Sequence, residues 1–434
     1  MKVEIEKMGF GGSGIGRLDD GRVVFVKKTV PGDIVDIKIL LQKKDFAFGA
    51  VNEIIKASPD RIEPDCQYFY RCGGCEHQNI PYEKQLEIKQ ALVEEALQRN
   101  QIKAKVEKII AGSDKHFYYR NSIRFMFELD NKNQIHISRH APDDKSLGVI
   151  SKCLLQSETS NKIASSIISY INSNISHKSS FWQLKIREGK RTGETMVEII
   201  TSDHDLPGEK GIVEALKNIK GVKSIYHTVA PAKSLLKLKR RLIFGSPVIY
   251  EKIGSYTFQI SPESFFQTNS EGVETLYNKI KEFANIKIGD EVIDLYCGTG
   301  SIGIYLSTLA KKVTGIEIVP EAVRDANDNA KINKIKNIEF ICADADDLAI
   351  EQHDNQIIIF DPPRAGLSKK LIEQLSNTKF KRLIYVSCNP ATFARDLKYF
   401  EIVGIKAKRI QPIDMFPQTH HTEVIAELYG QEFN

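Results

Sequence analysis

The sequence predicts a multidomain α/β protein built in three parts. Its 434 residues are enough for about two to four domains. Up to about Ile55, short apolar runs alternate with glycine turns, which is typical of a small β-barrel. From Ser261 onward, strand-like runs alternate with helical patterns, which predicts a parallel sheet with crossover helices. We expect domains at residues 1–57, 58–260 and 261–434, the second being of mixed α/β type.

The composition is ordinary for a soluble globular protein, and we expect the cytoplasm. No apolar run is long enough to span a bilayer, and the amino terminus lacks the apolar core of a secretory signal. The seven cysteines are unevenly spaced and do not resemble a disulfide framework, which favours reduced thiols. The net charge of +5 permits a nucleic-acid partner but does not require one, and it gives no reason to expect a membrane.

The first segment carries the turns of a five-stranded barrel. A glycine-rich turn spans Gly11 to Gly16, Asp20-Gly21 reads as a hairpin, and Pro31-Gly32 marks another turn. Lysines and aromatics interleave here, at Lys27, Lys28, Lys43, Lys44, Phe25, Phe46 and Phe48. Such pairs suit base stacking and phosphate contact. Because acids nearly balance the bases, the composition by itself favours a solvated surface above core phenylalanines.

The pattern Cys66-x5-Cys72-x2-Cys75 has the spacing of a metal clip, with Gly73-Gly74 inside it. A closed site requires a fourth ligand, and Cys153 is the remaining cysteine outside the C-terminal region. Four thiolates suit zinc or an iron–sulfur cluster, and the spacing does not separate the two. The alternative is three unrelated cysteines.

Between the cysteines and the C-terminal region the patterns are mixed. Tyr82 to Arg99 has the apolar stripe of an amphipathic helix, and Ile163 to Ile171 is also helical in pattern. Tyr118 to Phe125 and Met196 to Ile200 are strand-like.

In the C-terminal region, parallel strands are expected at Val292–Leu295, Lys312–Glu317, Ile338–Ala343, Ile357–Asp361 and Arg382–Ser387. The first strand leads into Gly298-x-Gly300-x-x-Gly303, which on its own would equally suit a dinucleotide. Glu317 lies at a strand end where an acid can hold a ribose. Asp294, before the glycines, suits a cationic ligand, and Asp344 could receive an adenine amino group. Together these acids favour an adenosyl ligand with a positive charge, such as S-adenosylmethionine.

Cys388 directly follows the strand that ends at Ser387, and Asn389-Pro390 then turns the chain. The carboxyl ends of parallel strands face the ligand crevice, so Cys388 is placed to act as a nucleophile. The alternative is a small cysteine packed at a strand end. Two carboxylates, Asp361 and Glu423, occupy other strand or loop ends nearby in the sequence.

With these residues in view, the chain resembles the RNA 5-methyluridine methyltransferases over essentially its whole length, in particular the bacterial 23S ribosomal RNA branch. The motifs that carry the resemblance are Ser261-Pro262-x-x-Phe265-Phe266-Gln267-x-Asn269, Asp361-Pro362-Pro363-Arg364-Ala365-Gly366, Ser387-Cys388-Asn389-Pro390-Ala391-Thr392, and Asp414-Met415-Phe416-Pro417 with Glu423. The resemblance implies an OB-like TRAM barrel that binds RNA, a central domain with a [4Fe–4S] cluster, and a Rossmann-like class I methyltransferase domain.

By this resemblance, Cys388 is the nucleophile and Glu423 the base. The site of the methyl donor, S-adenosylmethionine, would be lined by Gln267, Tyr296, Ser301, Glu317, Asp344 and Asp361. The cluster ligands would be Cys66, Cys72, Cys75 and Cys153. His420 and His421 stand where relatives vary and receive no role. The helix Tyr82–Arg99 is expected to pack on the catalytic domain. We expect a monomer whose partner is RNA, with no membrane and no DNA.

The implied chemistry explains the residue types. The C5 carbon of uracil is a weak nucleophile, and a thiolate added at C6 makes it reactive toward a methyl sulfonium. The free cysteine pKa of about 8.5 would have to be lowered by the site. After methyl transfer, a carboxylate removes the C5 proton so that the thiolate can leave. A buried thiol requires an unpaired or flipped uridine.

Three alternatives remain at this stage. A 5-methylcytidine methyltransferase also forms a cysteine adduct. The transfer-RNA branch of the uridine enzymes is closer, although it generally lacks the barrel and the cysteine cluster. The third is a non-catalytic RNA-binding iron–sulfur protein on a methyltransferase fold, which would not need both Cys388 and Glu423.

Overall fold

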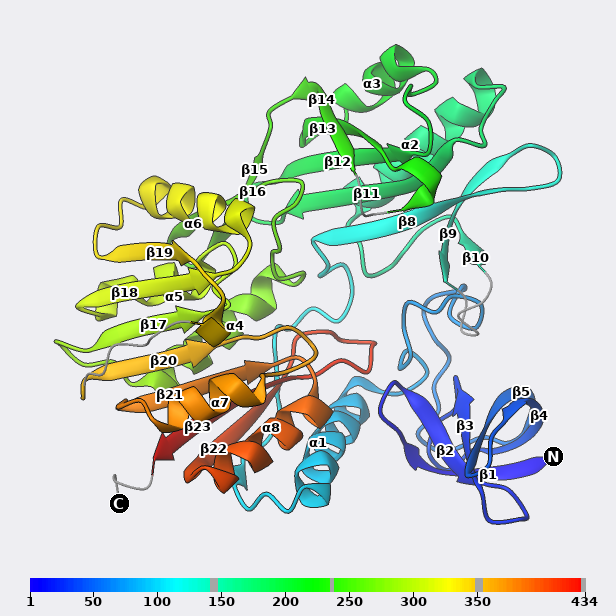
Figure 1. Ribbon diagram of the computed structural model, residues 1–434. Coiled ribbons are helices and arrows are strands. Elements are labelled where there is room, and N and C mark those ends of the chain that lie inside the picture. Colours follow the sequence, from blue (N-terminus) through cyan, green and yellow to red (C-terminus); the bar gives the residue numbers. More distant parts are fainter. Residues whose placement is uncertain (141–146, 235–237, 348–353, 431–434) are drawn as a thin grey trace.

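The N-terminal segment closes into the predicted five-stranded barrel (Figure 1). The structure is a computed structural model that describes residues 1–434 apart from 141–146, 235–237, 348–353 and 431–434. The barrel strands run in the order β1-β2-β3-β5-β4, with bounds β1 (Lys2–Met8), β2 (Ser13–Arg17), β3 (Val23–Lys27), β4 (Ile34–Gln42) and β5 (Phe46–Lys56). Alternate apolar residues such as Val3, Ile5, Val24 and Val26 fill its interior, as the period of a strand requires.

The middle of the chain forms a second, open sheet. Its order in the described residues is β10-β9-β8-β11-β12-β13-β14. The elements are β8 (Ser122–Leu129), β9 (Ile135–His140), β10 (Leu147–Ile150), α2 (Glu158–Asn174), β11 (Phe181–Gly189), β12 (Glu194–Thr201), α3 (Glu209–Lys217), β13 (Val222–Val229) and β14 (Lys239–Gly245). The helix predicted at 163–171 lies inside α2. The strand predicted from Tyr118 begins only at Ser122, because Tyr118 has a left-handed φ of 56° and its amide donates to Leu154 at 2.8 Å.

The C-terminal sheet has the order β19-β18-β17-β20-β21-β23-β22-β6. Its strands are β17 (Glu291–Leu295), β18 (Lys312–Glu317), β19 (Ile338–Cys342), β20 (Gln356–Phe360), β21 (Arg382–Ser387), β22 (Ile405–Asp414) and β23 (Glu423–Gly430). Strands β17 to β21 pair in parallel, whereas β23 pairs antiparallel with β21 and β22. The predicted parallel strands are all present, with ends shifted by at most one residue.

Helices cover both faces of this sheet and bury two apolar clusters against it. They are α4 (Ser270–Ala284), α5 (Ser301–Leu306), α6 (Pro320–Ile332), α7 (Lys369–Ser376) and α8 (Pro390–Ile402). A hairpin, β15 (Ile249–Ile253) with β16 (Tyr256–Ile260), joins this layer to the central sheet. No helix in the described part of the chain is long and apolar enough to cross a membrane.

An early segment completes the C-terminal layer. Helix α1 (Tyr82–Arg99) lies against α8 and β22, and Val93 and Leu97 are buried in the core beneath it (Figure 1). After this helix, β6 (Lys105–Val106) and β7 (Ile110–Ala111) pair in parallel with β22. The C-terminal sheet is therefore assembled from both ends of the chain.

Candidate active site

The strand order of the C-terminal sheet reverses between β17 and β20. In doubly wound sheets, ligands bind outside the carboxyl ends of the strands at such a point. The predicted site residues follow these strands: Tyr296 after β17, Glu317 at the end of β18, Asp344 after β19, Asp361 after β20 and Cys388 after β21. The fold thus collects at one edge residues that are spread over the C-terminal region.

The turn after β17 contains three residues in the left-handed backbone conformation. Tyr296, Gly298 and Gly300 have φ values of 60°, 54° and 75°. The amide of Gly298 donates to Oε2 of Glu317 at 3.1 Å, and the amide of Val319 donates to Oε1 at 2.9 Å. Both oxygens of this carboxylate are thereby fixed beside the turn, in the position that holds ribose hydroxyls in such folds.

Asp294 lies deeper than the sequence suggested. It is fully buried, and its Oδ2 accepts a hydrogen bond from the amide of Gly303 at 2.9 Å. A Cβ at Gly303 would stand 3.2 Å from that oxygen, so a glycine suits this turn. Burial raises the pKa of Asp294 to about 7. The carboxyl therefore braces the start of α5 and does not lie open at the sheet edge toward a cationic ligand.

The other residues predicted to line the donor site have the following contacts. The Ser301 and Tyr277 hydroxyls are 2.6 Å apart, which ties α5 to α4. The amide of Asp346 donates to Oδ1 of Asp344 at 3.0 Å. Burial raises the pKa of Tyr296 to about 12, with Asp346 and Asp344 contributing, so these acids lie near the Tyr296 ring. The carbonyl of Gln267 accepts from Nδ2 of Asn121 at 2.8 Å.

Strand pairing brings Cys388 and Glu423 together. In the antiparallel ladder of β21 and β23, Ser387 stands opposite Val424. Cys388 directly follows Ser387 and Glu423 directly precedes Val424, and the charge of Glu423 acts on the Cys388 thiol. Burial raises the pKa of Cys388 to about 11, which is opposite to the lowering that we expected from the chemistry, and the charges of Glu423 and Asp361 add to this. Burial also raises the pKa of Glu423 and of Asp361. A thiol and two carboxyls that hold protons unusually tightly therefore meet at one place.

Arg364 is a residue of this site to which the sequence analysis gave no role. Its positive charge lies close enough to both groups to lower the pKa of Cys388 and of Glu423. Its Nη2 is 3.2 Å from a ring nitrogen of His421, whose pKa burial lowers to about 3. Its carbonyl accepts from Nδ2 of Asn389 at 3.1 Å, which joins the two motif loops. The Asp361-Pro362-Pro363-Arg364 motif could have indicated this role, because it places the arginine three residues after the predicted site residue Asp361.

The segment that ends at Glu423 is held by helix α1. Nζ of Lys89 donates to Oδ1 of Asp414 at 2.6 Å, and both side chains are fully buried. Gln418 has a left-handed φ of 71°. Its amide donates to Oε1 of Gln85 at 2.9 Å, and Nε2 of Gln85 donates back to its Oε1 at 3.0 Å. A backbone conformation that is unfavourable alone persists because its surroundings fix it.

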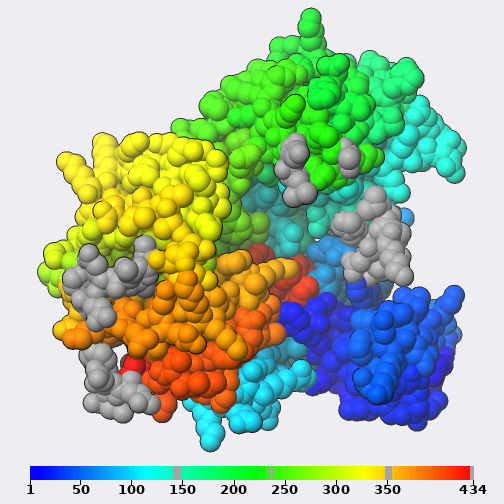
Figure 2. Space-filling view, in the orientation of Figure 1, coloured from blue at the N-terminus to red at the C-terminus, as the bar shows by residue number. Residues whose placement is uncertain are grey.

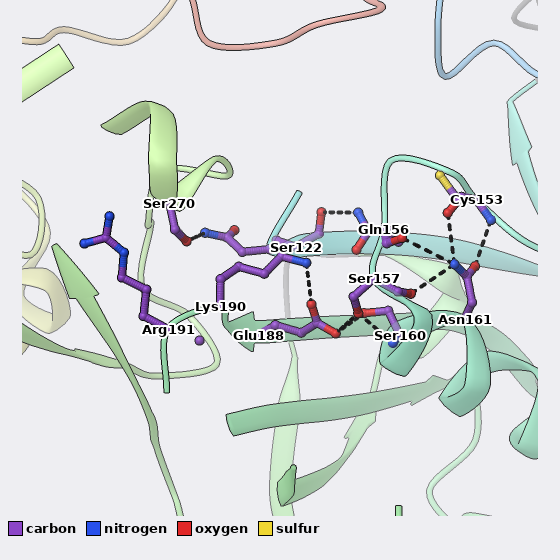
Figure 3. Close-up of polar contacts among 12 residues, drawn as sticks. Ser122, Cys153, Gln156, Ser157, Ser160, Asn161, Glu188, Lys190, Arg191 and Ser270 are labelled. Carbon is purple, nitrogen blue, oxygen red and sulfur yellow. Dashed lines mark hydrogen bonds and ion pairs between the residues drawn. The ribbon is translucent and has the colours of Figure 1, made fainter. Parts of the chain in front are cut away.

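The four predicted cluster ligands line one cavity, which contains Cys66, Cys72, Cys75 and Cys153. Asn161 clamps the last of these: the amide of Cys153 donates to Oδ1 at 2.8 Å, and Nδ2 donates to the Cys153 carbonyl at 3.0 Å (Figure 3). Arg120 and Arg139 line the same cavity. Among the described residues, no group of three or more His, Cys, Asp or Glu side chains is arranged to hold a metal ion.

The position of Lys28 differs from the one expected for the barrel. From the sequence, Lys28 was expected among surface lysines that face solvent or phosphate. Instead its Nζ donates to the carbonyls of Cys72 at 3.1 Å and Cys75 at 2.5 Å, and it lies 3.9 Å from the centre of the Phe69 ring. Burial lowers its pKa. The barrel therefore inserts a cation into the cysteine loop, residues 72–77.

Comparison with known proteins shows which family the chain belongs to. The family model described as "tRNA (Uracil-5-)-methyltransferase" matches residues 81–428, and the model of the TRAM domain matches residues 1–51. The first match covers well over half of the chain. The chain belongs to the RNA uracil-5-methyltransferase family.

The similarity to known proteins extends over almost the whole chain. It is 35% identical to an "Uncharacterized RNA methyltransferase" of Halalkalibacterium halodurans, over 99% of this chain and 96% of that one. A protein of the same description from Caldanaerobacter subterraneus is 36% identical over 98% and 97%. Among solved structures, Pyrococcus abyssi tRNA (uracil-54, C5)-methyltransferase with S-adenosyl-L-homocysteine matches with a TM-score of 0.80 and 28% identity, over 99% of each chain. The protein is an S-adenosylmethionine-dependent RNA uracil-5-methyltransferase.

In the TRAM domain of this methyltransferase, three phenylalanines gather on the outside of the barrel. Phe25 and Phe48 lie opposite each other on β3 and β5, with ring centres 5.5 Å apart. Phe46 meets both rings edge-on. Phe48 is 39% exposed, so these rings are not the core phenylalanines that one interpretation of the sequence expected.

Proposed function

We propose that this methyltransferase transfers a methyl group from S-adenosylmethionine to C5 of a uridine in 23S ribosomal RNA, through a covalent bond between Cys388 and C6. The observation that carries the proposal is the pairing of Ser387 with Val424, which sets Cys388 beside Glu423. A nucleophile and a proton acceptor have to reach adjacent atoms of one ring, C6 and C5. Neighbouring positions at a strand edge meet that requirement.

The reaction assigns one step to each group. Cys388 adds as a thiolate to C6, and the C5–C6 electron pair moves to form an enolate. C5 then takes the methyl group of the sulfonium, whose sulfur leaves with the bonding pair as a neutral thioether. Glu423 removes the C5 proton, the C5–C6 double bond forms again, and the thiolate of Cys388 departs. A raised pKa makes the Glu423 carboxylate a stronger base once it is deprotonated, and Arg364 favours the deprotonated forms of both Glu423 and Cys388.

The methyl donor would lie at the reversal of the strand order, against the residues that the sequence assigned to it. Glu317, fixed by two backbone amides, would hold the ribose. Tyr296 would lie beside the donor, and Asp344 would receive the adenine amino group. Gln267, Ser301 and Asp361 would complete the lining. The bound S-adenosyl-L-homocysteine of the Pyrococcus abyssi protein supports a donor site in this fold.

The cysteine cavity would hold a [4Fe–4S] cluster through Cys66, Cys72, Cys75 and Cys153. Four thiols around one cavity fit such a cluster, because each thiolate binds a different iron and the sulfurs stand apart. A zinc ion takes the same kind of ligands, so the metal content of the purified protein has to separate the two. Bound there, a cluster would supply a covalent link between the cysteine loop and Cys153. Brown protein with about four irons and four sulfides per chain is expected after anaerobic purification; stoichiometric zinc would reject the cluster.

The RNA partner has two candidates. The resemblance of the motifs and cysteines to the ribosomal RNA branch supports 23S ribosomal RNA. A transfer RNA is the second candidate, favoured by the solved structure of a tRNA methyltransferase that matches over 99% of both chains. That match weakens the argument from the barrel, because a tRNA enzyme can share the whole length of this chain. The exposed phenylalanines of the barrel support RNA contact in either case. We propose that the enzyme acts as a monomer.

The decisive experiment offers both RNAs separately. Purified protein is incubated with methyl-labelled S-adenosylmethionine and with 23S ribosomal RNA or transfer RNA from cells that lack the gene. Nuclease digestion and mass spectrometry then identify the product and its position. We expect 5-methyluridine in 23S ribosomal RNA. Label in transfer RNA alone would favour the second candidate. Label as 5-methylcytidine, or no transfer to either RNA, would refute the reaction.

A further inference from the structure

An aromatic row leads from the barrel to the nucleophile. Phe10, on the turn between β1 and β2, meets the ring of His420 edge-on, with centres 6.2 Å apart. The rings of His420 and His421 lie 4.1 Å apart. His421 contacts Arg364 at 3.2 Å, and the charge of Arg364 lowers the pKa of Cys388. The row therefore joins the TRAM domain through side-chain contacts to Arg364, whose charge acts on the reacting sulfur.

The barrel turn is fixed against this row. Gly12 adopts a left-handed φ of 75°, and a Cβ there would lie 2.6 Å from Cβ of Glu76 and 3.2 Å from Cβ of His420. The amide of His420 in turn donates to Oε2 of Glu76 at 3.2 Å. Figure 2 shows the blue barrel touching the orange and red surface of the C-terminal domain at this junction. Such close packing holds Phe10 in place before any ligand arrives, which lowers the entropy lost on binding.

Phe10 nevertheless leaves 55% of its surface exposed. A single exposed apolar side chain is ordinary on a protein surface. This one differs because its turn packs against the segment that carries His420 and His421 in an RNA enzyme. Its ring is in T-shaped contact with His420, and more than half of its surface stays open. Nucleic-acid bases stack on aromatic faces of this kind whatever their identity.

We propose that Phe10, braced by His420 and His421, is a stacking site for an unpaired base of the RNA within a few nucleotides of the target uridine. A flipped uridine leaves a gap in the strand, and a neighbouring base that stacks on Phe10 would keep the strand open. The inference rests on the proposed RNA methylation and adds a second contact point for the same strand. The TRAM domain would then contact the RNA next to the active site, through Phe10.

Photocrosslinking tests the site directly. The photoreactive analogue benzoylphenylalanine is placed at position 10, and the protein is mixed with 23S ribosomal RNA or tRNA transcripts that contain 5-fluorouridine. S-adenosylmethionine is included, because the Cys388 adduct becomes stable only after C5 has taken the methyl group: fluorine at C5 then cannot be removed as a proton, so the adduct persists and marks the target. We expect reverse transcription to stop within a few nucleotides of that uridine. The same analogue at Ile288, exposed at the opposite edge of the sheet, should give no RNA crosslink. Crosslinks from position 10 to protein alone, or to RNA far from the adduct, overturn the proposal.

Kinetics give a second, independent readout. Phe10→Ala should raise KM for the RNA about tenfold or more, while kcat and the affinity for S-adenosylmethionine stay unchanged. Phe10→Trp should restore KM because it keeps an aromatic face. An unchanged KM in Phe10→Ala contradicts the stacking site. Crosslinking needs no methyl transfer, so RNA crosslinked at position 10 of an inactive enzyme would refute the proposed function and keep the base site.

Discussion

The thiols in two regions of the molecule, the catalytic edge and the cysteine cavity, have different charged neighbours. At the catalytic edge, Cys388 has two carboxyls beside it, which raise its pKa, and Arg364, which lowers it. In the cysteine cavity, the neighbours of the thiols include Arg120 and Arg139, and Lys28 enters the cysteine loop from the barrel. Burial raises the pKa of Cys75 to about 12 and that of Cys388 to about 11, so burial does not distinguish the two regions.

The difference lies in the charges around each thiol. Fixed cations beside the cysteine loop partly offset the burial that raises the pKa of Cys75 and Cys153, which would help these thiols to ligate the proposed cluster. The carboxyls beside Cys388 make its thiolate depend on their own protonation, so its reactivity is adjustable. A catalytic thiol has to form and release a bond in every cycle, whereas a ligand keeps its bond.

Exchanging one thiol in each region should separate the two roles. Cys388→Ala leaves no nucleophile, so methyl transfer should fall by at least about 10⁴-fold and no covalent RNA complex should form. Its iron content should equal that of the wild type. Cys72→Ala should instead lose the cluster and lower the melting temperature. Denaturing gels of labelled RNA complexes and iron analysis measure both. A labelled adduct with Cys388→Ala would exclude this residue as the nucleophile.

Glu423→Gln should stop the reaction later than Cys388→Ala does. The amide keeps the size of the carboxyl but cannot take the C5 proton, so the final elimination should slow by about 10²–10⁴-fold. The enzyme should still attack C6 and accept the methyl group. A methylated protein–RNA adduct should then accumulate and survive a denaturing gel. Wild-type turnover by this variant would show that another group is the base.

Local patterns predicted the sheet and the strand end at Cys388, because strands and turns depend on neighbours in sequence. They could not predict what surrounds the site. Gln85 and Gln418 are 333 positions apart, and no local pattern announces their pairing. Lys28 looked like a surface lysine because a barrel segment with balanced charge says nothing about a partner loop. Glu423 was assigned from the resemblance, and its place beside Cys388 emerges only from the antiparallel pairing of β23.

Arg364→Gln should move the pH dependence of the reaction. The guanidinium lowers the pKa of Cys388 and of Glu423, so its loss raises both. Both groups act in the deprotonated form, so the rate rises with pH, and the rising limb should shift upward by about one unit. Near pH 7, below both raised pKa values, the losses at the two groups multiply, so this corresponds to roughly a hundredfold loss. His421→Gln is the matched control, because burial lowers the pKa of His421 to about 3 and it is already neutral. Equal profiles for Arg364→Gln and wild type would contradict the assignment.

Lys28→Met should give the smallest effect, on stability and not on chemistry. It leaves the carbonyls of Cys72 and Cys75 without this donor, which should lower the free energy of unfolding by about 2 kcal/mol. Cluster retention should fall as well. Lys44→Met, at an exposed position of the same barrel, should change stability by less than about 0.5 kcal/mol. Urea titrations and iron analysis compare the two. Indistinguishable variants would mean that the barrel does not support the cysteine loop.

Because α1 lies early in the chain, it is synthesised long before the residues that it packs against. Lys89 leaves the ribosome 325 residues before Asp414, its buried partner. At about 5–20 residues per second, the interval is roughly 15–65 s. Throughout it, the helix presents Val93 and Leu97 to solvent, since the core that buries them in the finished protein has not been made. Nascent chains therefore carry an exposed apolar stripe on the N-terminal side of the catalytic domain, and α1 can dock only after translation is nearly complete.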